Sequence, residues 1–156
     1  MCGITFFLIN NQQNNKEQLI SFYKKNLLDS SRKIRHRGPD WSGNFIFNNT
    51  NNTCFMNHER LSIIDPFKGS QPIIYKTENF TIALAVNGEI YNYKELKNDL
   101  EENGYKFKTN SDSEVILNLF KKYNIEAFKK LKGIFAICLW DKKSKKLYLI
   151  RDKVGV

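Results

Sequence analysis

Short apolar runs and one helical repeat organise the first half of the chain. Residues 4–9 form a continuous apolar, partly β-branched run, which predicts a buried strand. Residues 16–34 carry apolar side chains at helical spacing, which predicts an amphipathic helix that ends before the Gly-Pro pair at 38–39. Two further runs, "NFIFN" (44–48) and "TCFMNHERLSI" (53–63), predict a hairpin. The apolar stripe of the helix consists of Leu19, Ile20, Tyr23, Leu27 and Leu28.

The second half predicts two strands, then helices, then a final hairpin. The helix over 111–123 has a clear start signal, because Ser111 can cap it and Glu114 stands three residues later. Asn92 and Glu95 give a similar start to another helix, which stops at a glycine. This order of elements predicts an α+β layered sandwich with antiparallel sheets. The predicted strands are 72–75, 80–86, 133–140 and 146–152, and the predicted helices are 92–103, 111–123 and 125–131.

Composition narrows the class of protein. A length of 156 residues with 41% hydrophobic content fits one globular domain with its own core. The net charge of +9 raises the question of a nucleic-acid partner. The lysines are scattered over predicted helices and hairpins, however, and neither an RNA-binding aromatic motif nor a zinc-ligand spacing accompanies them. We therefore interpret the charge as a solvated surface and expect no nucleic acid, and we interpret the Asn clusters at 10–15 and 48–52 as polar loops.

The cysteines indicate a reducing compartment. Cys2, Cys54 and Cys138 cannot all pair, and none belongs to a CxxC motif. Cys54 and Cys138 stand in apolar runs, which predicts buried structural thiols rather than a disulfide scaffold. No apolar stretch approaches the length of a membrane span. We therefore expect a cytoplasmic protein without a membrane partner.

Four polar motifs stand at the ends of predicted elements, where functional sites are usually built. Each has a simple structural explanation of its own. The Gly-Pro pair can be a turn, Arg60 a surface cation, the "NG" at 87–88 a hairpin signal, and Asp112 a carboxylate favoured by the helix dipole. The motifs are "RHRGPD" (35–40), "HERLSIID" (58–65), "NGEIYN" (87–92) and "SDSE" (111–114).

Together with the opening "MCGI" and the closing "RDKVGV", these motifs resemble the glutamine-hydrolysing domain of asparagine synthetases. That domain is a class II glutamine amidotransferase with the N-terminal nucleophile hydrolase fold, an αββα sandwich. The resemblance spans residues 2–156. It implies an ATP-dependent synthetase domain that is absent from this chain. Because relatives continue past the last motif, we expect a sandwich that is incomplete at its C-terminal end, with an unpaired sheet edge and exposed apolar surface.

The resemblance implies that Met1 is removed and that Cys2 becomes both nucleophile and N-terminus. A free α-amine has a pKa of roughly 8, so it can take the thiol proton without a histidine. The two histidines, His36 and His58, then need no catalytic role, and we expect both to serve in structural hydrogen bonds.

The resemblance also assigns the remaining site residues. Asn87 and the Gly88 backbone N–H would stabilise the oxyanion, and Arg60 would bind the α-carboxylate of glutamine. Asp112 and Glu89 would bind its α-ammonium. Backbone groups of Leu61, Ser62, Ile63 and Ile64 would also contact the substrate, and the loop of Arg35, His36, Arg37, Gly38, Pro39 and Asp40 would border the pocket.

The implied reaction is hydrolysis of L-glutamine to glutamate and ammonia through a Cys2 thioester, with neither metal nor cofactor. In the missing domain, ATP and Mg²⁺ would activate aspartate, and ammonia would convert it to asparagine with release of AMP and diphosphate; a homodimer is one option for the whole enzyme. Two alternatives stay open, a glutaminase that serves another acceptor and an inactive regulatory homologue. A basic nucleic-acid-binding domain is the weakest hypothesis.

Overall fold

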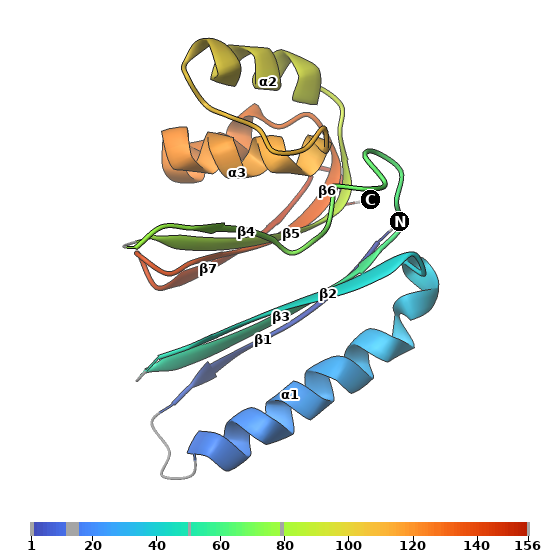
Figure 1. The fold of residues 1–156 in the computed structure, drawn as a ribbon, viewed down its shortest axis with the longest axis vertical. Helices are drawn as coiled ribbons and strands as arrows, with labels where there is room; N and C mark the ends of the chain where they lie inside the picture. Colours follow the sequence, from blue (N-terminus) through green and yellow to red (C-terminus); the bar gives the residue numbers. More distant parts are fainter. Residues whose placement is uncertain (1, 12–15, 50, 79, 156) are drawn as a thin grey trace.

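Two antiparallel sheets stack face to face, and helices cover both outer faces (Figure 1). The structure is a computed structural model, and it describes residues 2–11, 16–49, 51–78 and 80–155. Met1 and residues 12–15 of the Asn-rich loop therefore lie outside the described residues. One sheet has the order β1-β3-β2 and the other the order β4-β5-β6-β7. The strands are β1 (Gly3–Asn10), β2 (Trp41–Asn48), β3 (Asn52–Arg60), β4 (Ile73–Lys76), β5 (Thr81–Ile90), β6 (Gly133–Asp141) and β7 (Lys146–Arg151).

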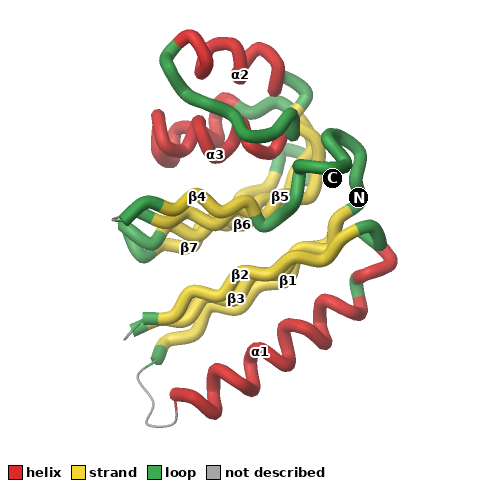
Figure 2. Tube along the Cα trace, in the orientation of Figure 1, coloured by secondary structure: helices red, strands yellow, loops and turns green. Residues whose placement is uncertain are grey.

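The helices divide between the two outer faces, and Figure 2 shows the resulting four layers. Helix α1 (Lys16–Lys33) runs along the first sheet, α3 (Asp112–Tyr123) lies along the second, and α2 (Tyr93–Glu102) packs against α3. Two short 3₁₀ helices, η1 (Arg35–Arg37) and η2 (Asn124–Lys130), follow α1 and α3. The predicted αββα sandwich is thus confirmed. No helix in the described ranges has the length and apolarity needed to cross a bilayer.

The alternation of apolar residues produces two separate cores. Between the sheets lie Cys54, Met56, Ala83, Ala85, Cys138 and Trp140, with Ile4 and Phe6 packed against them. A larger core between the second sheet and α2 and α3 contains Leu84, Val86, Ile116 and Leu139 among others. Continuous apolar runs such as "ALAV" arise because β5 is covered on both faces. All three cysteines are free, and Cys54 and Cys138 are buried as predicted.

The helix starts differ in part from the sequence signals. Ser111 caps α3 as expected, since its hydroxyl accepts a hydrogen bond from the Ser113 N–H. Glu114 does not close a capping box; its carboxylate accepts from the backbone N–H groups of Lys108 and Thr109. Asn92 makes no side-chain cap on α2, because its amide bridges to the backbone at 130 and 132. Tertiary partners outcompete local capping at both positions.

Strand β5 is longer than predicted, and this places the "NG" pair inside a sheet. The sequence suggested that the strand ends before Asn87, but Asn87 and Gly88 pair with Ala136 and Phe135 of β6. Gly88 has φ +143°, and a Cβ atom there would lie 2.0 Å from the carbonyl oxygen of Ile134. The pair is therefore a strand feature that needs glycine, and the hairpin interpretation is wrong.

Two further boundaries matter for the site. Strand β3 ends at Arg60, three residues earlier than predicted, so the segment from Leu61 onward is a loop. Strand β7 is an outer strand of its sheet among the described elements, with Leu149 58% exposed. A sheet edge with an exposed apolar side chain is therefore present at β7 among the described residues.

Candidate functional site

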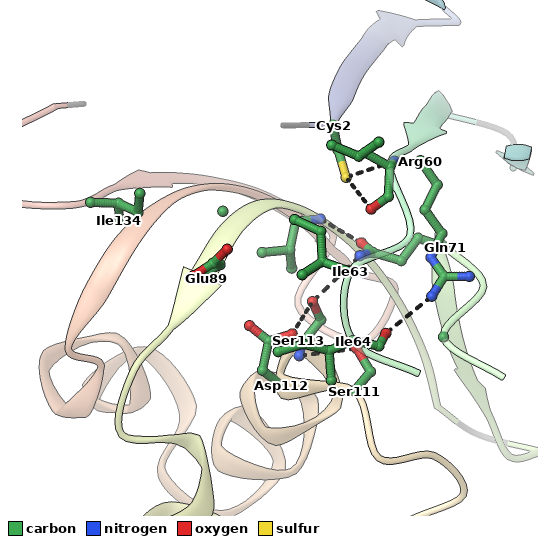
Figure 3. A pocket seen from close by; sticks show the side chains of 14 residues that line it. Cys2, Arg60, Ile63, Ile64, Gln71, Glu89, Ser111, Asp112, Ser113 and Ile134 are labelled. Carbon is green, nitrogen blue, oxygen red and sulfur yellow. Dashed lines mark hydrogen bonds between the residues drawn. The ribbon is translucent and has the colours of Figure 1, made fainter. Parts of the chain in front are cut away.

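A pocket forms where the start of β1, the end of β3, the far part of β5 and the N-terminus of α3 converge (Figure 3). These elements are far apart in the sequence, and only the stacking of the two sheets brings them together. The side chains that line it are mixed polar and apolar: Cys2, Arg60, Leu61, Ile63, Ile64, Gly69, Gln71, Val86, Gly88, Glu89, Ser111, Asp112, Ser113 and Ile134.

Cys2 lines the pocket and lies directly before the start of β1. Its thiol is half-buried and contacts the backbone of Leu61, where the N–H donates to Sγ at 3.3 Å and the carbonyl oxygen lies 3.7 Å from the sulfur. The Nε of Arg37 donates to the Cys2 carbonyl oxygen at 3.0 Å. The antiparallel register of β1 on β3, which pairs Gly3 with Glu59, brings the sulfur to this loop. Both the thiol and the main chain of Cys2 are therefore held in place.

The 35–40 loop holds this region rather than lining the pocket itself. The Asp40 N–H donates to the Arg60 carbonyl oxygen at 3.1 Å, and Asp40 Oδ2 accepts from the Ser62 N–H at 2.7 Å. A Cβ on Gly38 would lie 2.2 Å from the carbonyl oxygen of Glu59, so the loop lies directly against β3. Of the six predicted loop residues only Arg37 reaches a hollow beside the thiol. Ser62 likewise lies outside the pocket lining.

The buried carboxylate of Glu59 holds the 35–40 loop against the first sheet. Glu59 is 2% exposed and accepts hydrogen bonds from Ser31 of α1 at 2.5 Å and Ser42 of β2 at 2.8 Å. Its other oxygen lies 3.5 Å from the Arg35 guanidinium. Asn57 also donates to Glu59 and contacts Ser31. The network joins α1, β2, β3 and the loop, and it gives the motif "HERL" a structural reason for its glutamate.

Arg60 lines the pocket but also supports its wall. The residue is 5% exposed, and its guanidinium donates to the carbonyl oxygens of Ile64 (3.2 Å), Asp65 (2.8 Å) and Pro66 (3.0 Å). These bonds fold the loop after β3 around the cation. A guanidinium has five N–H groups, so donors are left for a ligand. The simple explanation of Arg60 as a surface cation is therefore wrong.

Asn87 and Gly88 lie on β5 on the side of the site where Cys2 stands. Asn87 shares a hollow with Cys2 and Arg37, while Gly88 lines the main pocket. The Asn87 Oδ1 atom is buried and has no hydrogen-bond partner among the described residues. A buried acceptor without a partner is costly, and such atoms often belong to ligand sites; the donor of the same amide is its Nδ2. The two predicted oxyanion donors are thus brought next to the thiol.

Two carboxylates provide negative charge on the opposite wall. Asp112 is the first residue of α3, is 6% exposed, and its Oδ2 accepts from the Ile90 N–H at 2.9 Å. Burial raises the pKa of the Asp112 carboxyl, and the nearby Glu89 carboxylate adds to the increase, while backbone N–H groups oppose it. The pocket therefore joins a thiol and a guanidinium to a paired acidic wall, a combination that suits a zwitterionic ligand.

The two histidines behave differently. His58 is fully buried, and its Nε2 lies 2.9 Å from the Val86 carbonyl oxygen, which confirms the predicted structural role. Burial lowers its pKa to about 4, so the ring is neutral and donates through Nε2. His36 is exposed in η1 and makes no hydrogen bond within the described part of the chain, so the expectation fails there because its turn faces solvent.

Sequence reasoning missed several lining residues, of which Gln71 is the most connected. Its Oε1 accepts from the Val86 N–H at 2.7 Å, and its Nε2 lies 3.4 Å from the Ser113 hydroxyl (Figure 3). In the sequence it stands in the turn "DPFKGSQP", where nothing marks it as buried. Gly69 and Ile134 were also unmarked, and Ser113 was seen only as part of "SDSE". No sequence signal identifies Gln71, because its burial depends on how the two sheets stack.

Comparison with known proteins gives a consistent picture. Residues 1–156 match the family model of the glutamine amidotransferase domain. The chain is 40% identical over 158 aligned residues to asparagine synthetase [glutamine-hydrolyzing] 3 of Arabidopsis thaliana, an alignment that covers 100% of this chain and 25% of that protein. It is 43% identical over 134 residues to asparagine synthetase [glutamine-hydrolyzing] 1 of Saccharomyces cerevisiae, an alignment that covers 86% of this chain and 22% of that protein. The chain therefore spans about a quarter of the length of these curated relatives.

Solved structures give the same fold. Glutamine phosphoribosylpyrophosphate amidotransferase from B. subtilis superimposes with a TM-score of 0.55 at 27% sequence identity, over 65% of this chain and 24% of that one. A second structure, of the allosteric regulatory enzyme of purine biosynthesis, gives a TM-score of 0.56 at 26% identity. These likenesses fit the predicted N-terminal nucleophile hydrolase sandwich.

Proposed function

This chain belongs to the glutamine amidotransferase domain family, and from that premise we propose that it hydrolyses L-glutamine to glutamate and ammonia. One observation carries the proposal. The Cys2 thiol, the Arg60 guanidinium and the Asp112 carboxylate line a single pocket. A nucleophile, a carboxylate binder and an ammonium binder are the groups needed to hold and attack a free amino acid that has a side-chain amide.

The nucleophile and its base belong to one residue. After removal of Met1, the Cys2 α-amine is free, and its ordinary pKa of roughly 8 lets it accept the thiol proton near neutral pH. His58 is held on Val86 and is neutral, so it is not the base. The Leu61 N–H directed at Sγ supports the developing thiolate. The sulfur then attacks the side-chain amide carbon of glutamine.

Charge on the amide oxygen is stabilised by Asn87 and by the backbone N–H of Gly88. The place of Asn87 supports this assignment, since its side chain shares a hollow with Cys2 and its Nδ2 can donate to the oxyanion. Gly88 permits the close approach of β5 to β6 that shapes this side of the site. One such donor typically contributes ~10²–10³ in rate.

The reaction then completes without a cofactor. The C–N bond breaks as the side-chain amide nitrogen of glutamine takes the proton that the Cys2 α-amine received from the thiol, and this nitrogen leaves as ammonia. A γ-glutamyl thioester remains on Cys2. Water, deprotonated by the same amine, attacks the thioester carbonyl, the C–S bond breaks, and glutamate is released with the thiol restored.

Recognition of glutamine uses the two ends of the pocket. The free donors of Arg60 bind the α-carboxylate, and backbone groups of the loop from Leu61 to Ile64 contact the substrate. Asp112 and Glu89 bind the α-ammonium. The 35–40 loop, fixed through Arg37 to the Cys2 carbonyl, closes the side of the site next to the thiol.

For the whole protein we propose a cytoplasmic, glutamine-hydrolysing asparagine synthetase. Identity of about 40% over the whole chain to proteins of that name supports this choice over another ammonia acceptor. ATP and Mg²⁺ would then act on aspartate in a second domain, and a homodimer is proposed with it. The likeness to a phosphoribosylpyrophosphate amidotransferase is weaker, at 27% identity. An inactive regulatory homologue is disfavoured by the assembled set of Cys2, Arg60, Asn87 and Asp112.

Selective alkylation tests the proposal. Cys54 and Cys138 are buried, and burial raises the pKa of each thiol to about 12, so iodoacetamide should label Cys2 alone. Labelling should abolish ammonia release from glutamine, and saturating glutamine should protect Cys2. Cys2→Ala should lose glutamine hydrolysis while keeping the melting temperature. Retained hydrolysis in the labelled protein or in Cys2→Ala would overturn the proposal.

A further inference from the structure

Gln71 bridges two parts of the site that carry different tasks. Its Oε1 accepts from the N–H of Val86 on β5, and its Nε2 donates to the hydroxyl of Ser113 on α3. The residue after Val86 is Asn87, and the residue before Ser113 is Asp112. We infer that Gln71 is a positioning residue that sets the oxyanion donors relative to the ammonium-binding carboxylate; this rests on the proposed function.

The point at which strand β4 begins explains why β5 needs the Gln71 side chain. Strand β4 pairs with β5 in a register that sets Ile73 opposite Leu84, and β4 begins at Ile73. Extending that register by two residues would set residue 71 opposite Val86. Pro72 has no N–H, and the backbone leaves the ladder there. The amide side chain of Gln71 therefore takes the place of the missing strand and satisfies the Val86 N–H.

The next peptide unit of β5, between Val86 and Asn87, is held by a different residue. The Val86 carbonyl oxygen accepts from His58 Nε2 at 2.9 Å, and His58 lies on β3 in the opposite sheet. Both backbone groups of Val86 are thus bound by side chains rather than by a neighbouring strand. Gln71 fixes the peptide plane before Val86 and His58 fixes the plane between Val86 and Asn87, so the backbone that leads into Asn87 is held by both residues.

The other end of the Gln71 amide acts on the acidic wall. The Ser113 hydroxyl lies 3.4 Å from Gln71 Nε2 and 3.5 Å from Asp112 Oδ1. Ser113 and Asp112 are the first two residues of α3. Gln71 therefore fixes the orientation of the Ser113 hydroxyl beside the carboxylate. Movement of Gln71 would disturb Asp112 without contacting it.

Burial leaves the amide no alternative. Gln71 is 7% exposed, and a Cβ on Gly43 of β2 would lie 2.0 Å from the Gln71 carbonyl oxygen, so the residue is enclosed between the sheets. The position needs an acceptor for Val86 and a donor for Ser113 at once. A primary amide supplies both, whereas an ionised carboxylate supplies acceptors only and an apolar side chain neither.

Three variants separate the two contacts in the purified protein. Gln71→Met removes both hydrogen bonds at similar size, and we expect kcat for glutamine hydrolysis to fall about tenfold or more and KM to rise. Gln71→Glu keeps an acceptor for the Val86 N–H, so kcat should recover toward wild type while KM stays raised. Ser113→Ala removes only the α3 contact and should raise KM with little change in kcat. Gln18→Met, on the exposed face of α1, is the matched control and should leave both constants unchanged.

The split between kcat and KM distinguishes positioning from a general loss of fold, since unfolding lowers the active fraction but cannot produce recovery of one constant alone. Urea midpoints of wild type and all four variants accompany the kinetics. Unchanged kcat and KM in Gln71→Met would overturn the inference, as would a loss of kcat in Gln71→Glu equal to that in Gln71→Met at an equal urea midpoint. If wild type itself releases no ammonia from glutamine, the proposed function fails instead. The position of Gln71 is then tested by hydrogen exchange. The backbone amide of Val86 should exchange faster in Gln71→Met than in wild type.

Discussion

The Nε2 atom of His58 lies 2.9 Å from the carbonyl oxygen of Val86, and this contact crosses from one sheet of the sandwich to the other. His58 is fully buried, and its Nδ1 has no hydrogen-bond partner among the described residues. A neutral ring with its proton on Nε2 fits both facts, because protonation of Nδ1 would bury an unpaired donor and a charge. The contact links the strand that precedes Arg60 to the strand that carries Asn87.

Acid should weaken this link, and the sign follows from the lowered pKa. Burial lowers the pKa of His58 from 6.5 to about 4, so between these values the unfolded chain binds more protons than the folded one. The His58 contribution to the free energy of unfolding is therefore full above pH 6.5 and falls as the pH drops to 4, by up to about 3 kcal/mol. Urea titrations at pH 7, 5.5 and 4.5 measure it.

His58→Gln keeps a donor but does not titrate, so its stability should depend less on pH over this range. His36→Gln, a change at the exposed histidine, is the control and should follow wild type. The comparison with wild type cancels other groups such as Asp112, whose raised pKa acts in the opposite direction. Parallel pH curves for wild type and His58→Gln would contradict the prediction.

The terminal amine can be tested by a removable extension. A few residues placed ahead of Cys2 convert its amine to an amide, which cannot accept the thiol proton. We expect glutamine hydrolysis to fall by ~10²–10⁴, the usual contribution of a general base, and to return after proteolytic removal of the extension. Ammonia release is measured, with the N-terminus verified by intact mass. Full activity in the extended protein would show that another group is the base.

Even lysine should not replace Arg60 without loss of glutamine binding. The guanidinium donates to three backbone carbonyl oxygens and must still bind a carboxylate, whereas an ammonium is a compact group with three donors. We expect Arg60→Lys to raise KM for glutamine by about tenfold or more, since a charge-assisted hydrogen bond contributes ~1.5–3 kcal/mol. Lys68→Ala, an exposed cation in the same loop, should leave KM within about twofold of wild type. An unchanged KM in Arg60→Lys would refute the carboxylate assignment.

Asp112→Asn should separate binding from stability. Burial raises the pKa of Asp112, so the ionised carboxyl destabilises the folded protein relative to the unfolded chain. Asparagine still accepts from the Ile90 N–H, so the melting temperature at pH 7 should equal or exceed that of wild type. KM should rise about tenfold or more because the α-ammonium loses its buried partner.

The control for Asp112 is Asp99→Asn on α2, an exposed residue paired with Lys122 at 3.2 Å. Exposed pairs contribute little, so both the melting temperature and KM should stay near wild type. A lower melting temperature in Asp112→Asn together with an unchanged KM would mean that Asp112 is a structural residue only.

Local sequence determined most of the secondary structure. Apolar periodicity placed the strand from residue 4, helix α1, α3 and the final hairpin, because burial of one or both faces leaves a direct trace in residue order. It misplaced the ends of β3 and β5. Those ends depend on partner strands, since Asn87 and Gly88 remain in the sheet only because β6 pairs with them.

The residues of the candidate site also fall into those predicted from the sequence and those found only in the structure. The sequence, through the resemblance of its short motifs to a known family, predicted the chemically distinctive members Cys2, Arg60, Asn87 and Asp112. Only the tertiary structure decided that Arg60 also folds its own loop, that Glu59 anchors the 35–40 loop from behind, and that Gln71 bridges β5 and α3. The physical reason is that hydrogen bonds between distant segments depend on how the two sheets stack, and residue order records burial and local turns but not which orphaned N–H a buried amide will reach.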